Sequence, residues 1–300
     1  MTKEVKGIFI AMITPFTEKG EIYEEGIRNI VEWLVSNRVH GIFPNSSTGE
    51  ALKMTSDERV RVARVALEHA SSNVMVTPGI SGNTVDHAVD EARKIADLGV
   101  DGIVVIPPYY YRLSFKALKK FYRFILEKID KPVLLYNIPS SSCNMLEVEL
   151  VKQLAEYSNL AAIKDSSGNL SYTGNLIREI GDRVSVMQGS ELLLLPTLAM
   201  GGKGGVLGIA NFVPKLFVNL YNSFREKKLE KATMLQKTAY DVLYRLVLGS
   251  TDSFFYNVKY ALRKIGIDVG YPREPYAVTS PEDLARIDEM IEYLRNEGLL

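Results

Sequence analysis

Cysteine is scarce in this sequence, and neither sign of charge is in excess. The single cysteine among 300 residues is Cys143, so an internal disulfide is impossible and a cytoplasmic location is expected. Lysine plus arginine and aspartate plus glutamate number 36 each, which argues against nucleic acid or an anionic membrane as the main partner. No apolar run is long enough to span a bilayer, and residues 1–6 do not begin a secretory signal, so no membrane association is expected.

Patterns of metal ligands are also lacking. No two histidines stand at the spacing of a metal site and no CxxC occurs, so a zinc site is not expected. Cys143 lies far in sequence from His40, His69 and His87, and none of these histidines ends an expected strand. We therefore interpret Cys143 as a buried or loop thiol rather than a nucleophile.

What the sequence does contain is a regular alternation of two kinds of segment. Short runs rich in valine, isoleucine and leucine end near Ile13, Pro44, Thr77, Ile106, Tyr136, Lys164, Gln188 and Leu207. Such continuous apolar runs are typical of a parallel sheet that is covered on both faces. Between them, apolar residues recur at helical spacing in the ranges 22–36, 56–71, 84–98, 114–129 and 146–157.

This alternation predicts an α/β fold, a (β/α)8 TIM barrel with a C-terminal helical extension. The alternative is a doubly wound open sheet, which would carry a Gly-x-Gly-x-x-Gly loop after its first strand. The segment Thr14–Gly20 lacks that loop. Residues 1–227 are expected to form the barrel, and residues 228–300 only helices packed on it, one of them capped by Ser280. The glycine-rich segment Gly201–Gly205 precedes the eighth strand, so we interpret it as a tight connection.

The ends of barrel strands are where reacting groups are expected. Lys164 closes a buried apolar run, where a charged amine is costly to bury, and a neutral amine attacks carbonyl carbon. Tyr136 ends the preceding run and suits acid or base chemistry. The turn Ser47-Thr48-Gly49 can bind a carboxylate or phosphate through hydroxyls and two or three backbone N–H groups. The alternatives are a strand-capping lysine, a core tyrosine and an ordinary helix cap.

Three motifs in combination resemble a known family. The motifs are Ser47-Thr48-Gly49-Glu50, Tyr136-Asn-Ile-Pro139 and Lys164-Asp-Ser-Ser-Gly168. They are similar to those of the pyruvate-dependent class I aldolases, which include N-acetylneuraminate lyase, dihydrodipicolinate synthase and archaeal 2-keto-3-deoxygluconate aldolase. The motifs fall in order at the ends of strands two, five and six, and the resemblance extends over the whole chain.

The resemblance implies a role for each candidate residue. Lys164 would form a Schiff base with the keto group of pyruvate, while Tyr136 would move the proton of the aldol hydroxyl. Tyr110 would reach into a neighbouring subunit's site and relay protons. The implied substrate-binding residues are Ser47, Thr48, Gly49, Ser166, Gly189 and Gly208. Pyruvate, an aldehyde and the 2-keto acid would be the only partners besides a homotetramer's own copies, and no metal or organic cofactor would be needed.

Departures from the family pattern narrow the range of expected substrates. Ser141 stands where dihydrodipicolinate synthases carry an arginine that binds a carboxylate, which argues against that activity. The segment Gly189-Ser190-Glu191 is nearer to the Gly-Ser-Asp of deoxygluconate aldolases, and the segments Tyr109–Tyr111 and Val269–Pro275 also resemble theirs. The expected reaction is therefore 2-keto-3-deoxygluconate to pyruvate plus glyceraldehyde. The alternatives are the N-acetylneuraminate or dihydrodipicolinate reactions, or a non-catalytic 2-keto acid binding protein.

Two further features are left open by the sequence. Cys143 stands where the family usually has glycine, which leaves the geometry of the loop around Ser141 and Ser142 unsettled. Arg112 and Arg245 could bind the phosphate of a phosphorylated sugar acid. The alternative is that both arginines are solvated or lie at an interface.

Overall fold

The strands form one parallel sheet that closes on itself. A computed structural model describes residues 4–247 and 254–300, and within them nine strands follow the order β3-β2-β1-β9-β8-β7-β6-β5-β4. Their bounds are β1 Gly7–Ala11, β2 Gly41–Phe43, β3 Met75–Val76, β4 Gly79–Ile80, β5 Ile103–Val105, β6 Val133–Asn137, β7 Leu160–Asp165, β8 Ser185–Gln188 and β9 Gly204–Leu207. The expected strand ends agree with these bounds to within a few residues.

The two edge strands, β3 and β4, are halves of one interrupted strand. Only Thr77 and Pro78 separate them, and proline cannot donate to a ladder. Hydrogen bonds nevertheless continue on both sides, since Thr77 N–H donates to Ile42 O at 2.9 Å and Val104 N–H to Pro78 O at 2.9 Å. The sheet is therefore an eight-stranded barrel, and the predicted fold is confirmed rather than the open-sheet alternative.

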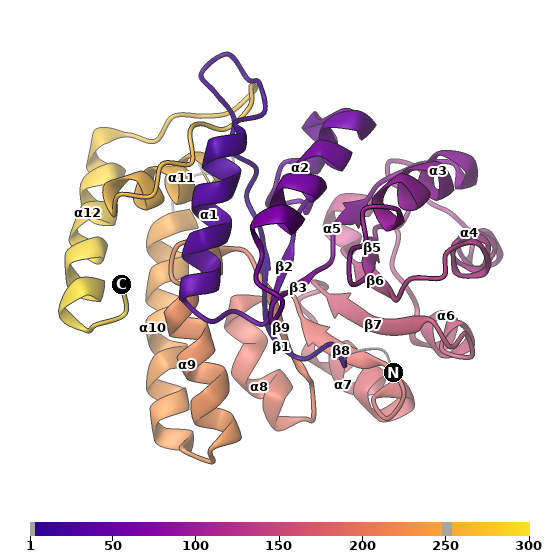
Figure 1. The fold of residues 1–300 in the computed structure, drawn as a ribbon. Helices are drawn as coiled ribbons and strands as arrows, with labels where there is room; N and C mark the ends of the chain where they lie inside the picture. The colour runs from indigo at the N-terminus through magenta and orange to yellow at the C-terminus, as the bar shows by residue number, and fades with distance from the viewer. Residues whose placement is uncertain (1–3, 248–253) are drawn as a thin grey trace.

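Helices follow the strands and cover the outside of the barrel (Figure 1). They are α1 Glu24–Ser36, α2 Ser56–His69, α3 Val85–Ala96, α4 Phe115–Lys128, α5 Pro139–Ser142, α6 Val148–Leu154, α7 Leu170–Ile180, α8 Leu194–Ala199 and α9 Pro214–Arg225. Local sequence explains their starts. Thr55, for example, forms a capping box with Glu58 before α2.

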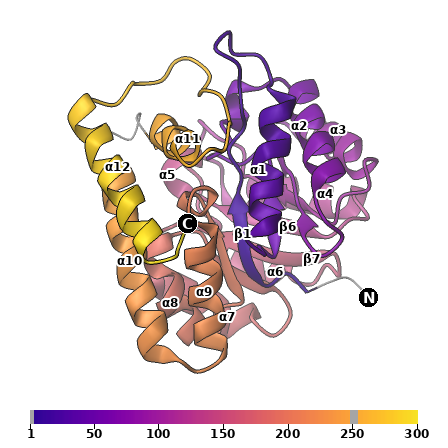
Figure 2. The same cartoon turned by 60° about the vertical axis from the view of Figure 1, so that its left-hand side comes forward.

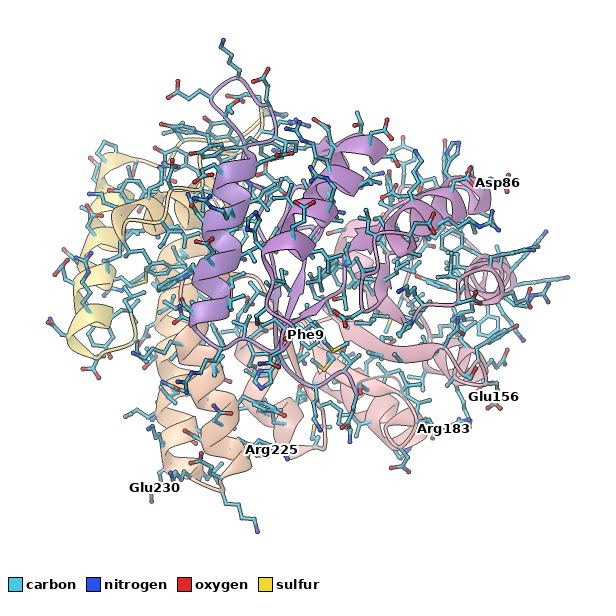
Figure 3. The ribbon with its side chains drawn as sticks, viewed as in Figure 1. Phe9, Asp86, Glu156, Arg183, Arg225 and Glu230 are labelled. Carbon is cyan, nitrogen blue, oxygen red and sulfur yellow. The ribbon has the colours of Figure 1, made fainter. Side chains whose placement is uncertain are left out.

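Apolar residues fill the inside of the barrel as well as the layer beneath the helices. The interior set is Val5, Phe9, Ala11, Phe43, Met75, Val104, Ile106, Leu134, Tyr136, Ala162, Met187 and Val206. Figure 3 shows Phe9 among the strands, whereas Asp86, Glu156 and Arg183 lie at the periphery. The interior is thus a packed core, and space for a ligand can exist only at an end of the barrel.

Three helices complete the chain beside the barrel. They are α10 Leu229–Val247, α11 Phe254–Lys264 and α12 Pro281–Asn296. Figures 1 and 2 show α12 alongside α10, with α11 near the top of the barrel, and Ser280 caps α12 as expected. The predicted division at residues 227 and 228 falls between α9 and α10. Within the described ranges, no helix combines the length and apolar character needed to cross a membrane.

Candidate active site

The register of two neighbouring strands places the candidate lysine and tyrosine side by side. Tyr136 of β6 pairs directly with Lys164 of β7, and both side chains point into the barrel at its C-terminal end. Lys164 Nζ lies 4.0 Å from the centroid of the Tyr136 ring and 5.4 Å from that of Phe43. Both residues are nearly inaccessible, with Tyr136 2% and Lys164 5% exposed. The amine therefore sits over aromatic faces at the bottom of a site.

The next pair in the register, Asn137 and Asp165, points outward and fixes the strand ends. The Asp165 carboxylate accepts hydrogen bonds from Asn137 Nδ2 at 2.9 Å, Ser167 N–H at 3.0 Å and Thr173 Oγ1 at 2.6 Å. Because Asp165 directly follows Lys164, these bonds hold the backbone that carries the amine. Asp165 belongs to the Lys164–Gly168 motif, whose residue types alone do not indicate this function.

The surroundings of Tyr136 favour its ionised form. Burial raises the pKa of the phenol, but the charge of Lys164 and hydrogen bonds with Ser47, Lys164 and Ser166 lower it by more. The resulting pKa lies below the ordinary value of 10.0. Ser47 Oγ lies 3.1 Å from Tyr136 Oη, which links the turn after β2 to the strand-end pair. A phenol in this setting can accept and return a proton.

The turn after β2 uses some of the amides that were expected to face a ligand. Gly49 N–H donates to Ser46 Oγ at 2.9 Å, and Glu50 N–H donates to Ser47 O at 3.1 Å. A Cβ at position 49 would lie 2.6 Å from Met12 O, so packing alone requires glycine there.

In this conformation Ser46 Oγ accepts the hydrogen bond of the Gly49 amide, and a substrate contact of Gly49 stays a prediction. No described residue accepts a hydrogen bond from the N–H of Ser47 or Thr48. These two residues, with their hydroxyls, are what the turn offers to an anion.

A cavity of about 230 Å³ opens above the lysine–tyrosine pair. It is lined by Thr48, Tyr136, Ile138, Ser140, Lys164, Ser166, Gly189, Glu191, Gly208, Ile209, Leu243 and Phe254. Six of the predicted site residues are in this set, and Ser47 joins it through Tyr136. The lining residues come from the ends of five strands and from the C-terminal helices.

Two glycines keep the cavity open. A Cβ at Gly189 would lie 1.9 Å from Ser166 Oγ and collide with it. A Cβ at Gly208 would lie 3.1 Å from Thr48 Oγ1 and 3.5 Å from Glu191 Oε1. Any side chain at either position would take space from the cavity or displace a neighbouring polar group.

Glu191 is a cavity residue whose role the sequence analysis missed. It begins the short helix η2 (Glu191–Leu193), and its Oε1 accepts hydrogen bonds from Gly208 N–H at 2.7 Å and Ile209 N–H at 3.0 Å. The sequence signal that could have identified this role is an acidic residue three positions after the end of β8. Its carboxylate faces the cavity as a fixed acceptor.

The C-terminal helices also contribute to the cavity wall. Leu243 of α10 and Phe254 of α11 both line it. Nothing in the local sequence distinguishes these two residues from others on apolar helix faces. They are brought here by packing between segments far apart in the chain.

Several candidate residues lie outside the cavity. Tyr110 is 77% exposed with φ of +78°, and its ring lies 4.9 Å from that of Tyr111. Arg112 is exposed on the same loop. Arg245 lies in a groove between α10 and α12, 3.7 Å from Glu289. Neither arginine is among the lining residues, so their placement gives no support to phosphate binding at this site.

Cys143, in the loop after β6, has a backbone conformation that favours glycine. Cys143 caps α5 with φ of +60°, in the left-handed region that favours glycine. Ser142 Oγ closes the loop by donating to Ile138 O and Asn144 O, each at 2.9 Å. Ser140 and Ser141 are both exposed, and only Ser140 lines the cavity.

Comparisons with known proteins agree with this geometry. The pattern of the dihydrodipicolinate synthetase family matches residues 4–294. An uncharacterized DapA-like lyase of Pyrobaculum islandicum is 36% identical over 97% of this chain and 98% of its own. A 4-hydroxy-tetrahydrodipicolinate synthase of Methanothrix thermoacetophila is 32% identical over 95% of this chain and 96% of its own.

A solved structure shows the same fold with a ligand of the expected kind. It is a prophage protein of the dihydrodipicolinic acid synthase family from E. coli K12 in complex with pyruvate. Its chain is 29% identical, superposes with a TM-score of 0.89, and is matched over 98% of this chain and 99% of its own.

Proposed function

Because the chain belongs to the dihydrodipicolinate synthetase family, we propose that it is a pyruvate-dependent aldolase that acts through a Schiff base on Lys164. The observation that carries this proposal is the direct pairing of Tyr136 with Lys164 on adjacent strands. That register puts an amine and a phenol of lowered pKa together at the base of a cavity. The coarser assignment, a lyase of this family, rests on the family membership itself.

The first step is condensation of the amine with a 2-keto acid. Neutral Lys164 Nζ attacks the keto carbon. The carbonyl oxygen leaves as water with one proton from the amine and one from the Tyr136 hydroxyl, so that a protonated imine and the Tyr136 phenolate remain. The hydroxyls and amides of Ser47 and Thr48 lie on one side of the cavity, where they would bind the carboxylate. Ser166, beside Tyr136, would hold the leaving water or the carboxylate.

The second step breaks the carbon–carbon bond. Tyr136, as phenolate, takes the proton of the hydroxyl on the fourth carbon, and that oxygen becomes the carbonyl of the departing aldehyde. The bonding electrons move to the third carbon and into the iminium, giving an enamine. Tyr136 then returns a proton to the third carbon, and water hydrolyses the imine to pyruvate and the free amine.

We propose 2-keto-3-deoxygluconate as the substrate, with glyceraldehyde as the second product. Glu191 favours a polyhydroxylated aldehyde as the second product. Its fixed carboxylate can accept hydrogen bonds from hydroxyl groups and would repel the carboxylate of an acidic aldehyde. Lys164 is the only basic residue among those that line the described cavity. The volume of about 230 Å³ is small for a ligand pocket and favours a short aldehyde.

The test is pyruvate release from 2-keto-3-deoxygluconate by the wild type and by Lys164→Ala. Release that is lost in the variant would support both the substrate and the lysine. No release from the wild type would remove this substrate. Borohydride reduction in the presence of pyruvate, followed by mass analysis, would then show whether Lys164 forms any imine, and absence of an adduct would favour a non-catalytic binding protein.

A second candidate reaction has one specific observation in its favour. Relatives that cover nearly the whole chain carry the name 4-hydroxy-tetrahydrodipicolinate synthase. That reaction would join pyruvate to aspartate semialdehyde, whose carboxylate would have to lie near Glu191 without a basic partner in the described cavity. Consumption of aspartate semialdehyde at a rate exceeding sugar-acid cleavage would make this the function.

A further inference from the structure

A buried ion pair joins the C-terminal helices to the turn after β2. Lys259 of α11 and Glu50 are both inaccessible to solvent, with Nζ 2.8 Å from Oε1. The same ammonium donates to the carbonyl oxygens of Thr14 at 2.6 Å and Tyr271 at 2.8 Å. All three ammonium protons therefore have acceptors, as a buried cation requires. The proposed chemistry uses neither partner.

Glu50 occupies a backbone conformation that its side-chain contacts must maintain. Its φ is +56°, in the left-handed region that costs a residue with a side chain about 1 kcal/mol. Its second oxygen, Oε2, accepts from Lys53 Nζ at 3.0 Å and from Arg273 N–H at 3.1 Å. Both carboxylate oxygens are thus held, and the backbone of the turn is held with them.

The turn and the end of β1 form a single packed unit. Ser46 Oγ donates to Met12 O at 3.3 Å, and the Gly49 backbone packs directly on the same carbonyl. Lys259 spans this unit, because it contacts Thr14 on one side and Glu50 on the other. Glu50 follows Thr48 by two residues, so the lysine fixes the distance between the β1 end and the anion-binding turn.

We propose that Lys259 is a positioning residue for the pyruvate-carboxylate site, acting through Glu50 on the turn that carries Ser47 and Thr48. The inference rests on the proposed function, since it needs a 2-keto acid carboxylate at this turn. It also gives α11 two parts in substrate binding. Phe254 at its start lines the cavity, and Lys259 in its middle sets the shape of the turn.

The test measures imine formation alone, with no aldehyde present. Wild type, Lys259→Met and Lys264→Met are incubated with increasing pyruvate, reduced with borohydride, and analysed by intact mass. Lys264 is the matched control, because it lies on the same helix and forms an exposed ion pair with Asp288 at 2.9 Å. We expect Lys259→Met to reach the wild-type maximum at about tenfold higher pyruvate, equivalent to about 1.4 kcal/mol. Lys264→Met should match the wild type.

A second variant separates positioning from folding. Lys259→Met combined with Glu50→Gln removes the buried carboxylate charge, which Lys259→Met alone leaves with only the partly exposed Lys53 as a counter-ion. Thermal stability should therefore recover relative to Lys259→Met. The pyruvate requirement should stay raised, because the link between Thr14 and the turn is still missing.

The outcomes that would overturn the inference are distinct. Recovery of both stability and the pyruvate requirement in the double variant would show that the lysine acts only through folding. An unchanged pyruvate requirement in folded Lys259→Met, or an equal shift in Lys264→Met, would also overturn it. A wild type that forms no adduct at any pyruvate concentration would instead remove the proposed function, and this inference with it.

Discussion

The cavity and the joint with the C-terminal helices each contain a buried lysine, in opposite surroundings. Lys259 is surrounded by acceptors, namely the Glu50 carboxylate and two carbonyl oxygens. Lys164 lies over two aromatic rings and forms no ion pair with a described carboxylate. An ammonium whose three protons all have hydrogen-bond acceptors is held in place, whereas an amine without a counter-ion is accessible to an electrophile. Burial alone therefore does not identify a reactive lysine. What distinguishes the two lysines is whether hydrogen-bond acceptors surround the amine.

The largest effect should come from removing the cavity lysine. Lys164→Met should form no borohydride adduct with pyruvate and release no pyruvate from substrate, because no other amine lines the cavity. Lys259→Met should still form the adduct at saturating pyruvate. Peptide mapping of the adduct checks the comparison, and label on Lys259 in the wild type would contradict it.

The next effect concerns the phenol beside the lysine. Tyr136→Phe should lower kcat by about 10²–10⁴-fold while pyruvate still forms the imine. Because the pKa of Tyr136 lies below 10.0, wild-type kcat should rise with pH toward a midpoint below that value, and the variant should lose this limb. The control is Tyr122→Phe, since the buried Tyr122 hydroxyl has no partner among the described residues. Loss of activity in that control would indicate a general effect of removing a buried hydroxyl.

The third effect is on stability at the joint. Lys259→Met should lower the free energy of unfolding near pH 7 by about 3 kcal/mol, because it leaves the buried Glu50 charge with only the partly exposed Lys53 as a counter-ion. Urea denaturation measures this. The double variant with Glu50→Gln should regain part of the loss, and a single variant as stable as the wild type would mean that the ion pair contributes nothing net.

This stability difference should depend on pH with a definite sign. Burial, together with the charges of Lys53 and Arg263, lowers the pKa of Lys259 to about 8 although Glu50 raises it. Between about 8 and the ordinary 10.5 the unfolded chain binds more protons at this residue, so stability contributed by Lys259 rises with pH. The gap between wild type and Lys259→Met should widen across this window by about 3 kcal/mol. A gap that narrows would contradict the lowered pKa.

The smallest effect is expected at the exposed lysine of the same helix. Lys264→Met should leave Tm and pyruvate affinity unchanged, because an exposed ion pair with Asp288 is screened by water and salt. Thermal unfolding at low and high salt checks this. A change comparable to that of Lys259→Met would remove the distinction between the two ion pairs.

Much of the barrel and the centre of the site could be predicted from sequence, because both follow from local patterns. Continuous apolar runs identify the strands, and the barrel rule then places whatever ends them at one mouth, which brings Tyr136 and Lys164 together. The break in the strand at Pro78 was not expected, but it does not open the barrel. Hydrogen bonds to carbonyl oxygens continue the sheet on both sides of the break.

What sequence could not provide was contact between distant segments. Packing of α10 and α11 on the barrel is what brings Leu243, Phe254 and Lys259 to the site. The helical period of the sequence indicates only that one face of each helix is buried. The hydrogen bond that the Gly49 amide donates is a related case. A local motif does not show that Ser46 will occupy that N–H first.

Gly208 has a consequence for how this enzyme can change over generations. The site of its missing Cβ is bounded by Thr48, Glu191 and Phe254, which belong to three separate stretches of the gene. One nucleotide change in a glycine codon can introduce alanine, serine or valine there, and each would shorten the cavity without touching Lys164 or Tyr136. A single mutation at Gly208 can therefore narrow the cavity beside Thr48 while the codons of Lys164 and Tyr136 are inherited unchanged.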